Sequence, residues 1–311
     1  MRKYLFVLVL VSACTPAPTP IFEEASLPGD IIANNVFFYY DDVEAATTFY
    51  TEVLGLEVVT DYEFAKILRV ADTSFLTLVS GESGMHSTEE PKAVAIALVT
   101  DELEAWYDYL VEKEVPMRGE LKVGEGRPHD GFVAYDPEGY YLEFERFNAH
   151  AENEKLMPVL DATTSRYTSA GPPELGFKAT VLWTYYRDLP AAERFYEDVM
   201  GMTLIVDQGW AKIYRTSETG FIGLVDGERG MHQATQDKAV TVSFLTTDVD
   251  AWFEHLAGQQ ALEKLRLRHD EVLDEGFVRV FVAYDPENYF LEFDTFQEYE
   301  GNEALLAALA E

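Results

Sequence analysis

Two stretches of the chain have almost the same sequence: "AYDPEGYYLEFERF" at Ala134–Phe147 and "AYDPENYFLEFDTF" at Ala283–Phe296. Each begins with an Asp-Pro turn signal, because proline fixes φ at about −65° and a glycine or asparagine follows two residues later. The residues after the turn are apolar and aromatic, and they predict a β-strand in both places.

Carboxylates interrupt both predicted strands. Successive side chains of a strand face opposite sides, so Glu143 and Glu145 share one face with Tyr141, while Leu142 and Phe144 share the other. The second stretch repeats this alternation, with Phe290, Glu292 and Asp294 on one face and Leu291 and Phe293 on the other. If the Leu/Phe face packs on a helix, the carboxylates must face solvent or a cavity.

The repetition extends over most of the chain. Phe49–Trp106 aligns without a gap with Phe195–Trp252, at an offset of 195 − 49 = 146, and the two Asp-Pro turns differ by 285 − 136 = 149. Self-similarity over this length indicates duplication of a whole domain. The segment 148–176 contains Pro, Gly, Ser and Thr, and we predict that it links the two copies.

Each copy is predicted to run strand, helix, three strands, and then to repeat that order. In the first copy Asp42 is placed to cap a helix that Gly55 ends, and Asp188 and Pro190 begin the equivalent helix of the second copy. In the first copy the second round of this order begins with a predicted strand near residue 93, which is followed by a predicted helix at 102–113. The chain therefore holds four predicted βαβββ modules.

The chain opens with "MRKYLFVLVLVSAC", in which two basic residues precede an apolar run too short to span a bilayer as a helix. This order is typical of a signal peptide, and Val11–Cys14 resembles a bacterial lipobox. That resemblance implies a lipid on Cys14, the only cysteine, and a protein anchored in the cell envelope outside the cytoplasm. The alternative is an ordinary secretory signal. The Pro-rich residues 15–30 follow residues 1–14 as a predicted tether.

Acidic residues outnumber basic ones by 56 to 23 in the 311 residues, and the formal net charge is −33. Such a chain repels nucleic acid, so we expect no nucleic-acid partner. The charge suits cationic ligands, or simply a well-hydrated surface. The sequence has no GxSxG, HExxH or glycine-rich phosphate loop that would indicate hydrolase or nucleotide chemistry.

The paired modules, "FYTEVLGL" at Phe49–Leu56 and "DPEGYYLEF" at Asp136–Phe144 resemble the vicinal oxygen chelate superfamily, which includes glyoxalase I, extradiol dioxygenases and bleomycin-binding proteins. The resemblance implies an α+β fold of two tandem domains, each made of paired βαβββ modules that form a cup-shaped mixed sheet. We place these domains at 31–147 and 177–296. An acidic, Ala/Leu-rich helix is predicted at 297–311.

The resemblance also implies where a metal would be held. The implied positions are Asn35, Thr77, Ala95 and Glu143 in the first copy, and Val181, Gly223, Val242 and Glu292 in the second. Only the two glutamates are usual ligands, Asn35 and Thr77 are weak oxygen donors, and hydrocarbon side chains cannot coordinate. We therefore predict no metal and no cofactor.

Strand alternation is expected to place Asn35, Phe37 and Tyr39 in the same cup as the carboxylates of the first copy. The candidate ligand-binding residues are Asn35, Phe37, Tyr39, Thr77, His86, Tyr141, Glu143, Glu145 and Glu292. The second cup is expected to be filled by its own side chains, from Val181, Trp183, Tyr185, Val242, Phe244 and Phe290. An acidic, aromatic cup suits a small cationic or aromatic molecule. Alternatively, both glutamates serve structure.

A "GMH" loop occurs in both copies and carries His86 and His232. Either histidine could act in acid–base chemistry, but we expect a loop histidine bonded to its own backbone. Three functions stay open: a membrane-tethered protein that binds a small molecule, a glyoxalase-like lyase or extradiol-type dioxygenase with a non-standard metal site, and a scaffold for a partner protein. The missing ligands favour the first.

Overall fold

The structure of the protein, a computed structural model, describes residues 28, 30–259 and 266–311. The predicted signal peptide with Cys14, and nearly all of the tether, lie outside these residues. Within the described ranges, no helix has the length and apolar character needed to cross a membrane.

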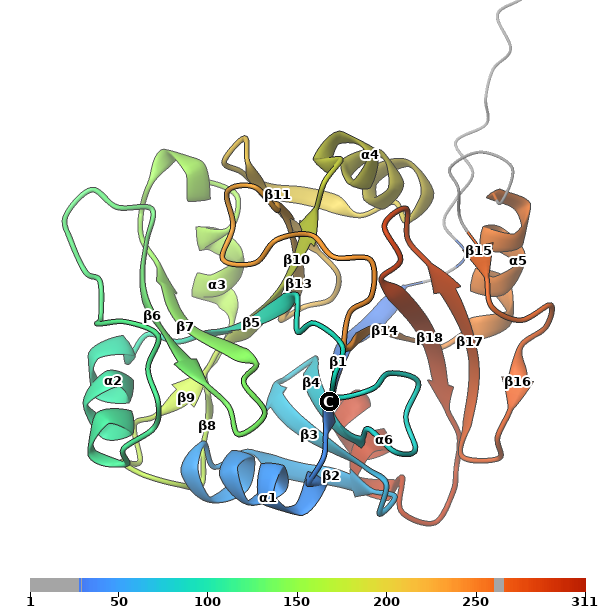
Figure 1. Cartoon of the computed structure of the whole chain (residues 1–311), viewed down its shortest axis with the longest axis horizontal. Helices are drawn as coiled ribbons and strands as arrows, with labels where there is room; N and C mark the ends of the chain where they lie inside the picture. The colour runs from blue at the N-terminus through green and yellow to red at the C-terminus, as the bar shows by residue number, and fades with distance from the viewer. Residues whose placement is uncertain (1–27, 29, 260–265) are drawn as a thin grey trace, which may run out of the picture.

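The first copy contains two modules in series (Figure 1). Module 1 consists of β1 (Ile31–Tyr40), α1 (Val43–Thr48) with its π-helical continuation η1 (Phe49–Val53), β2 (Glu57–Asp61), β3 (Ala65–Ala71) and β4 (Ser74–Ser80). Module 2 consists of β5 (Val94–Val99), α2 (Leu103–Glu112), β6 (His129–Tyr135) and β7 (Tyr141–Phe147).

The second copy repeats this order, except that module 4 has two short strands, β15 and β16, for which module 2 has no counterpart among the described residues. Module 3 consists of β10 (Ala179–Tyr186), α4 (Leu189–Arg194) with η3 (Phe195–Val199), β11 (Thr203–Asp207), β12 (Ala211–Arg215) and β13 (Gly220–Asp226). Module 4 consists of β14 (Val240–Thr246), α5 (Val249–Gln259), β15 (Arg266–Leu267), β16 (Leu273–Asp274), β17 (Val278–Tyr284) and β18 (Phe290–Phe296).

The remaining elements join or follow the copies. The predicted linker holds η2 (Ala151–Asn153), α3 (Met157–Ala162), β8 (Arg166–Tyr167) and β9 (Gly176–Phe177), and the C-terminal segment holds α6 (Glu303–Leu309). The predicted helix caps are confirmed, because the side chains of Asp42 and Asp188 accept hydrogen bonds from the N–H groups of Ala45 and Ala191. Gly55 has the positive φ of 70° expected just after a helix.

The strands form two large mixed sheets. One has nine strands, in the order β15-β17-β18-β14-β1-β4-β3-β2 with β16 paired to β17, and the other has seven, in the order β11-β12-β13-β10-β5-β7-β6. The copies meet within both sheets, where β1 pairs antiparallel with β14 and β10 pairs antiparallel with β5. Each sheet therefore combines the first module of one copy with the second module of the other.

This arrangement confirms the predicted α+β class with tandem modules, but it changes which residues share a cup. We expected β1 and β7 to line the same cup, and instead β1 belongs to the nine-stranded sheet while β7 belongs to the seven-stranded sheet. The duplication explains the error. Strands β5 and β14 are equivalent and equally apolar, so sequence patterns alone do not decide which of them β1 joins.

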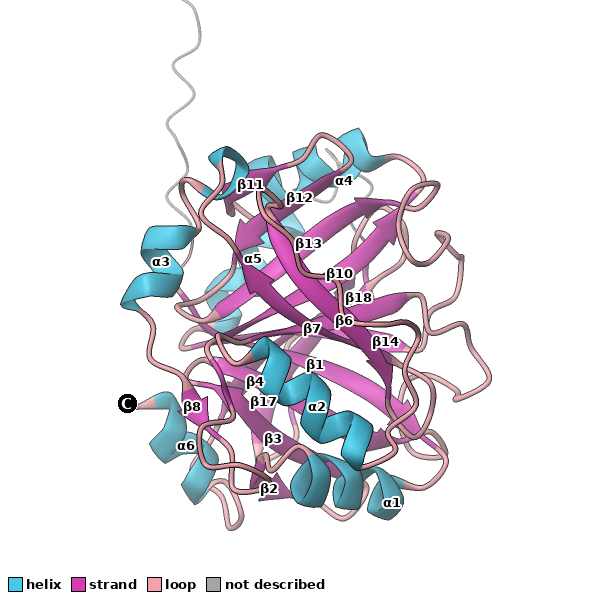
Figure 2. Ribbon diagram, turned by 90° about the vertical axis from the view of Figure 1, so that its left-hand side faces the viewer, coloured by secondary structure: helices cyan, strands magenta, loops and turns pink. Residues whose placement is uncertain are grey.

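The Leu/Phe faces of β7 and β18 pack on helices. Leu142 and Phe144 lie in the main core with Trp106 of α2, and the Trp106 and Phe144 rings are 5.4 Å apart. Trp252 of α5 and Phe293 repeat this contact at 5.3 Å. Figure 2 shows the helices at the periphery and the strands at the centre. The opposite, carboxylate-bearing faces are therefore turned away from the helices.

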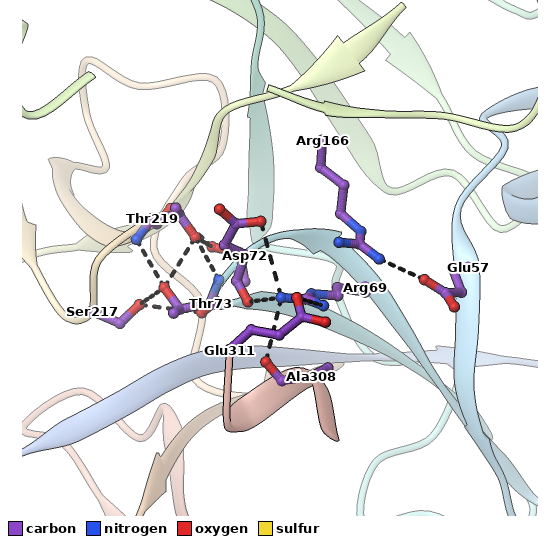
Figure 3. A network of polar contacts seen from close by, with 10 residues as sticks. Glu57, Arg69, Asp72, Thr73, Arg166, Ser217, Thr219, Ala308 and Glu311 are labelled. Carbon is purple, nitrogen blue, oxygen red and sulfur yellow. Dashed lines mark hydrogen bonds and ion pairs between the residues drawn. The ribbon is translucent and has the colours of Figure 1, made fainter. Parts of the chain in front are cut away.

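The boundary between the copies is marked by a reciprocal hydrogen bond. The N–H of Thr73 donates to Thr219 Oγ1 at 2.9 Å, and the N–H of Thr219 donates to Thr73 Oγ1 at 2.8 Å (Figure 3). These residues are equivalent, since 219 − 73 = 146, so the copies are related by an approximate two-fold axis here. Figure 3 also shows Arg69 of β3 joined to the C-terminal segment through Glu311 and the carbonyl of Ala308.

Candidate functional site

Each large sheet has a cavity on its carboxylate-bearing face. We call the cavity of the nine-stranded sheet the acidic cup; its volume is about 540 Å³ and its lining includes Phe37, Tyr39, Thr77, Glu275, Glu292 and Asp294. We call the cavity of the seven-stranded sheet the arginine cup; its volume is about 380 Å³ and its lining includes Arg118, Glu143, Glu145, Trp183, Trp210 and Arg229.

Two carboxyl groups form the floor of the acidic cup. Glu292 and Asp294 are buried side by side on β18, and Ser243 Oγ donates to Asp294 Oδ2 at 2.6 Å. Burial raises the pKa of Asp294 to about 7, even though the Ser243 hydrogen bond opposes the shift. Burial, followed by repulsion from Asp294, raises the pKa of Glu292 well above its usual value, and Arg268 opposes this. The pair is therefore poorly compensated when both groups are ionised.

The walls of the acidic cup are aromatic and contain few free polar groups. The Asn35 amide donates to Thr77 Oγ1 at 2.8 Å, and the hydroxyls of Tyr39 and Thr241 are 2.7 Å apart. The aromatic lining residues are Phe37, Tyr39, Tyr62, Phe64, Phe277 and Phe296. No Lys, Arg or His belongs to the lining of this cavity in the described part of the chain.

His86 packs against Tyr39, which lines the acidic cup. Its ring centre is 4.1 Å from that of Phe290 and 5.1 Å from that of Tyr39. Its Nδ1 is 2.8 Å from Glu90 Oε2, so the expectation of a histidine bonded to its own backbone is wrong. Burial lowers the pKa of His86 despite the opposing effect of Glu90. The carboxylate four residues away was the sequence signal that could have revealed this pair.

The second copy places the equivalent His232 against Tyr185, which lines the arginine cup. Its ring centre is 4.1 Å from that of Tyr141 and 5.2 Å from that of Tyr185. Gln236 replaces the carboxylate of Glu90. Burial, followed by the charge of Arg118, lowers the pKa of His232 to about 4, so this ring is neutral at physiological pH.

The floor of the arginine cup repeats the carboxyl pair. Burial raises the pKa of Glu143 to about 7, with Arg118 opposing, and burial followed by repulsion from Glu143 raises the pKa of Glu145 well above its usual value. The indole of Trp183 lowers the pKa of Glu143 slightly, yet its N–H has no acceptor at hydrogen-bond distance among the described residues.

Trp183 fills part of the arginine cup. It lies beside Gly223 in the sheet, as Phe37 lies beside Thr77 in the acidic cup. A Cβ atom on residue 223 would stand 2.0 Å from the Trp183 ring, so glycine leaves the space that the indole occupies. The sequence-based expectation that Trp183 would line a cup is met. Its partners are Glu143 and Glu145, and not Glu292 as expected.

The structure divides the predicted site residues between the cups. Asn35, Phe37, Tyr39, Thr77, His86 and Glu292 lie at the acidic cup, and Tyr141, Glu143 and Glu145 lie at the other sheet. Val242 and Phe244 were expected in a cup but pack in the helix-facing core. Ser243 faces Asn35 and Glu292 instead. A shift of one residue along a strand turns the side chain to the other face, which explains this error.

Part of the first copy also matches a known family by sequence. Residues 32–144 match the model of the Glyoxalase/Bleomycin resistance protein/Dioxygenase superfamily. This stretch belongs to that superfamily. No curated protein matches the chain significantly in sequence.

Solved structures of this superfamily's fold resemble nearly the whole chain. Glyoxalase I from Zea mays superposes with a TM-score of 0.60 at 16% identity, covering 88% of this chain and 94% of that one. A putative dioxygenase from Bacillus subtilis superposes with a TM-score of 0.60 at 14% identity, covering 86% of each. At such identities the likeness shows the fold and leaves the activity to the residues of the site.

Those residues do not fit a metal centre of the type that the superfamily resemblance implies. In the acidic cup Asn35 and Thr77 hydrogen-bond to each other, and Ser243 donates to Asp294, which leaves the two floor carboxyls as donors. The arginine cup offers Val181 and Gly223 at the corresponding positions. Within the described ranges no three His, Cys, Asp or Glu side chains are grouped to hold an ion. The absence of a metal stays a prediction.

Proposed function

We propose that the protein binds a small, planar cationic molecule in the acidic cup without a metal, and that a lipid on Cys14 anchors it in the cell envelope outside the cytoplasm. The observation that carries the binding proposal is the buried pair Glu292 and Asp294 at the floor of a cavity with aromatic walls, to whose lining the described residues contribute no cation.

A cationic ligand would relieve the main electrostatic cost of this site. A buried carboxylate without a partner is costly, and a positively charged group placed at the floor would favour its ionised form. A hydrogen bond between charged groups contributes about 1.5 to 3 kcal/mol. The rings of Phe37, Tyr62 and Phe277 would add ring contact and cation–π attraction of about 0.5 to 2 kcal/mol.

The anchoring part of the proposal is supported by the sequence alone. The charged and apolar leader ends in "VSAC", and the Pro-rich residues that follow would separate the lipid from the folded cups. Cells that express the wild type should incorporate labelled fatty acid into the protein, whereas cells that express Cys14→Ser should not. Label that persists in the variant would contradict a lipid on Cys14.

Binding can be tested with three probes of one shape: 4-nitrobenzylammonium, neutral 4-nitrobenzyl alcohol and anionic 4-nitrobenzoate. We expect the purified protein to bind the cation in calorimetric titrations. The double variant Glu292→Gln, Asp294→Asn keeps the shape of the floor but removes its charge, so its Kd for the cation should rise by about tenfold to a hundredfold. Its Kd for the alcohol should change little.

The arginine cup supplies the matched control. The double variant Glu143→Gln, Glu145→Gln alters the equivalent floor, and it should leave the Kd of 4-nitrobenzylammonium in the acidic cup unchanged. If both double variants bind the cation as the wild type does, or if the alcohol binds as tightly as the cation, then the carboxyl pair does not select a cation and the proposal fails.

A further inference from the structure

The mouth of the arginine cup carries unpaired positive charge. Elsewhere many basic side chains are paired with carboxylates, as Lys66 is with Asp61 and Arg146 with Glu104. Arg118, Lys122 and Arg229 have no carboxylate within 4.0 Å in the described ranges, and they line this cup or the cavity of about 240 Å³ that adjoins it. In a chain with a net charge of −33, such a concentration of free cations indicates an anionic ligand.

Two of these cations are held in place by aromatic rings. The guanidinium of Arg118 lies 5.2 Å from the centre of the Tyr141 ring, and that of Arg229 lies 5.2 Å from the centre of the Trp210 ring. Stacking on a ring restrains a guanidinium while its N–H groups stay available to an acceptor. A planar guanidinium can donate two parallel hydrogen bonds to one carboxylate.

The same cavity contains buried polar atoms without hydrogen-bond partners. Trp183 Nε1, His129 Nδ1 and Glu145 Oε2 have no partner within the described part of the chain, and all three residues line the arginine cup. The side chain of Trp183 is 8% exposed. Leaving such atoms unsatisfied is costly, and a ligand with hydrogen-bond acceptors would satisfy the N–H of Trp183.

We propose that the arginine cup is a second binding site, which takes a planar aromatic carboxylate with its acid group between Arg118 and Arg229. Trp183 and Trp210 then provide the apolar walls that the ring contacts. Burial raises the pKa of Glu143 to about 7 and the pKa of Glu145 well above its usual value, so the floor carries less negative charge at neutral pH than two ionised carboxylates would. This inference goes beyond the function proposed for the acidic cup, and the two sites bind ligands of opposite charge.

Tryptophan fluorescence can report on this cup alone. The chain has four tryptophans: Trp183 and Trp210 line the arginine cup, whereas Trp106 of α2 and Trp252 of α5 are buried in the main core. None lines the acidic cup. We expect 4-nitrobenzoate to quench the fluorescence of the full chain in a saturable way, because its nitro group will contact an indole. Neutral 4-nitrobenzyl alcohol should bind about tenfold more weakly or worse.

Both arginines are exposed, so the double variant Arg118→Gln, Arg229→Gln should fold normally, which circular dichroism will verify. Its Kd for 4-nitrobenzoate should rise at least about tenfold. Arg268 supplies the matched control. The N–H of Arg268 donates to the carbonyl of Val282 as that of Arg118 does to Val133, so Arg268 is the equivalent residue beside the acidic cup. Arg268→Gln should leave the quenching unchanged.

Several results would overturn this proposal: no saturable quenching by 4-nitrobenzoate, an unchanged Kd in the double variant, or quenching by 4-nitrobenzylammonium with equal affinity. The acidic cup is tested independently, because Glu292→Gln, Asp294→Asn should not alter quenching by 4-nitrobenzoate. Either site can therefore fail without the other.

Discussion

The two cups have equivalent floors and different rims. Glu292 and Asp294 in one correspond to Glu143 and Glu145 in the other, and burial raises the pKa of all four. The rims differ at equivalent positions: Ser83 and Phe64 of the acidic cup correspond to Arg229 and Trp210 of the arginine cup. We infer that the carboxyl floor is the shared part of the design, and that the rim sets the charge of the ligand.

A further difference lies in how much of each cavity the protein fills. Thr77 of the acidic cup corresponds to Gly223, and the larger ring of Trp183 takes the place of Phe37. The arginine cup, of about 380 Å³, adjoins a separate cavity of about 240 Å³, whereas the acidic cup is one cavity of about 540 Å³. These two differences, at Gly223 and at Trp183, reshape a cup without any change of backbone topology.

The largest expected effect comes from separating the copies. Both sheets are joined through pairs that cross the copies, β1 with β14 and β10 with β5, so residues 31–147 alone leave two strands without partners. We expect this fragment to lack a folded monomer, and to form dimers in which two fragments exchange modules. Size-exclusion chromatography with light scattering measures this.

A stable, monomeric fragment 31–147 with a cooperative unfolding transition would contradict the cross-copy sheets. Mixing this fragment with residues 177–311 should restore a one-to-one complex, and that complex should recover the binding of 4-nitrobenzylammonium. This control separates loss of a partner from loss of folding ability.

The second prediction compares the floors through the pH dependence of stability. The pKa of Asp294 is about 7 in the folded state and about 3.9 when unfolded, so the folded state binds the proton more tightly. Its contribution to stability is therefore present at low pH and is lost as the pH rises toward 7. Between pH 5.5 and pH 8 this loss is about 2 kcal/mol.

Urea unfolding of the double variant Glu292→Gln, Asp294→Asn should accordingly show a smaller fall in the free energy of unfolding between pH 5.5 and pH 8. Glu143→Gln, Glu145→Gln should flatten the profile to a similar extent, because the pKa of Glu143 is also about 7. Part of the slope should persist in both variants, since burial also raises the pKa of Asp136 and Asp285 to about 6. A wild-type profile already flat across this range would show that the floors are hydrated.

The smallest expected effect concerns the loop histidines. Glu90 opposes the lowering of the pKa of His86, and the second copy has Gln236 at that position. Glu90→Gln should therefore lower the pKa of His86 toward that of His232, which is about 4. Titration of the histidine ring protons by NMR measures the change, with His232 as an internal reference. An unchanged or higher pKa would mean that the contact between His86 and Glu90 does not form in solution.

Local features of this fold could be read from the sequence. Residue spacing over short stretches predicts the helix caps at Asp42 and Asp188 and the strand faces around Glu143 and Glu292. It also predicts the duplicated order of the modules. Pairing between distant strands could not be read in this way. The duplication makes β5 and β14 equivalent partners for β1, and only packing of the whole chain distinguishes them.

The candidate sites show the same limit. The floor carboxyls were identifiable because a charged residue inside an apolar strand breaks the pattern, and Asp294 could have been added by the same rule. Arg118 and Arg229 were not identifiable, since they lie in loops where the sequence has no periodicity. Their position at one cavity depends on β5 joining β10 of the other copy.

Joining both halves in one polypeptide has a further consequence for how these sites can change. In a symmetric homodimer every substitution would appear in both clefts at once, so the clefts would stay identical. Here a substitution in module 3, such as one at Gly223, alters the arginine cup and leaves the acidic cup unchanged. Covalent linkage also fixes the two sites at equal stoichiometry. A pair of recognition sites with opposite preferences can thereby arise from a single ancestral pocket while always being carried together.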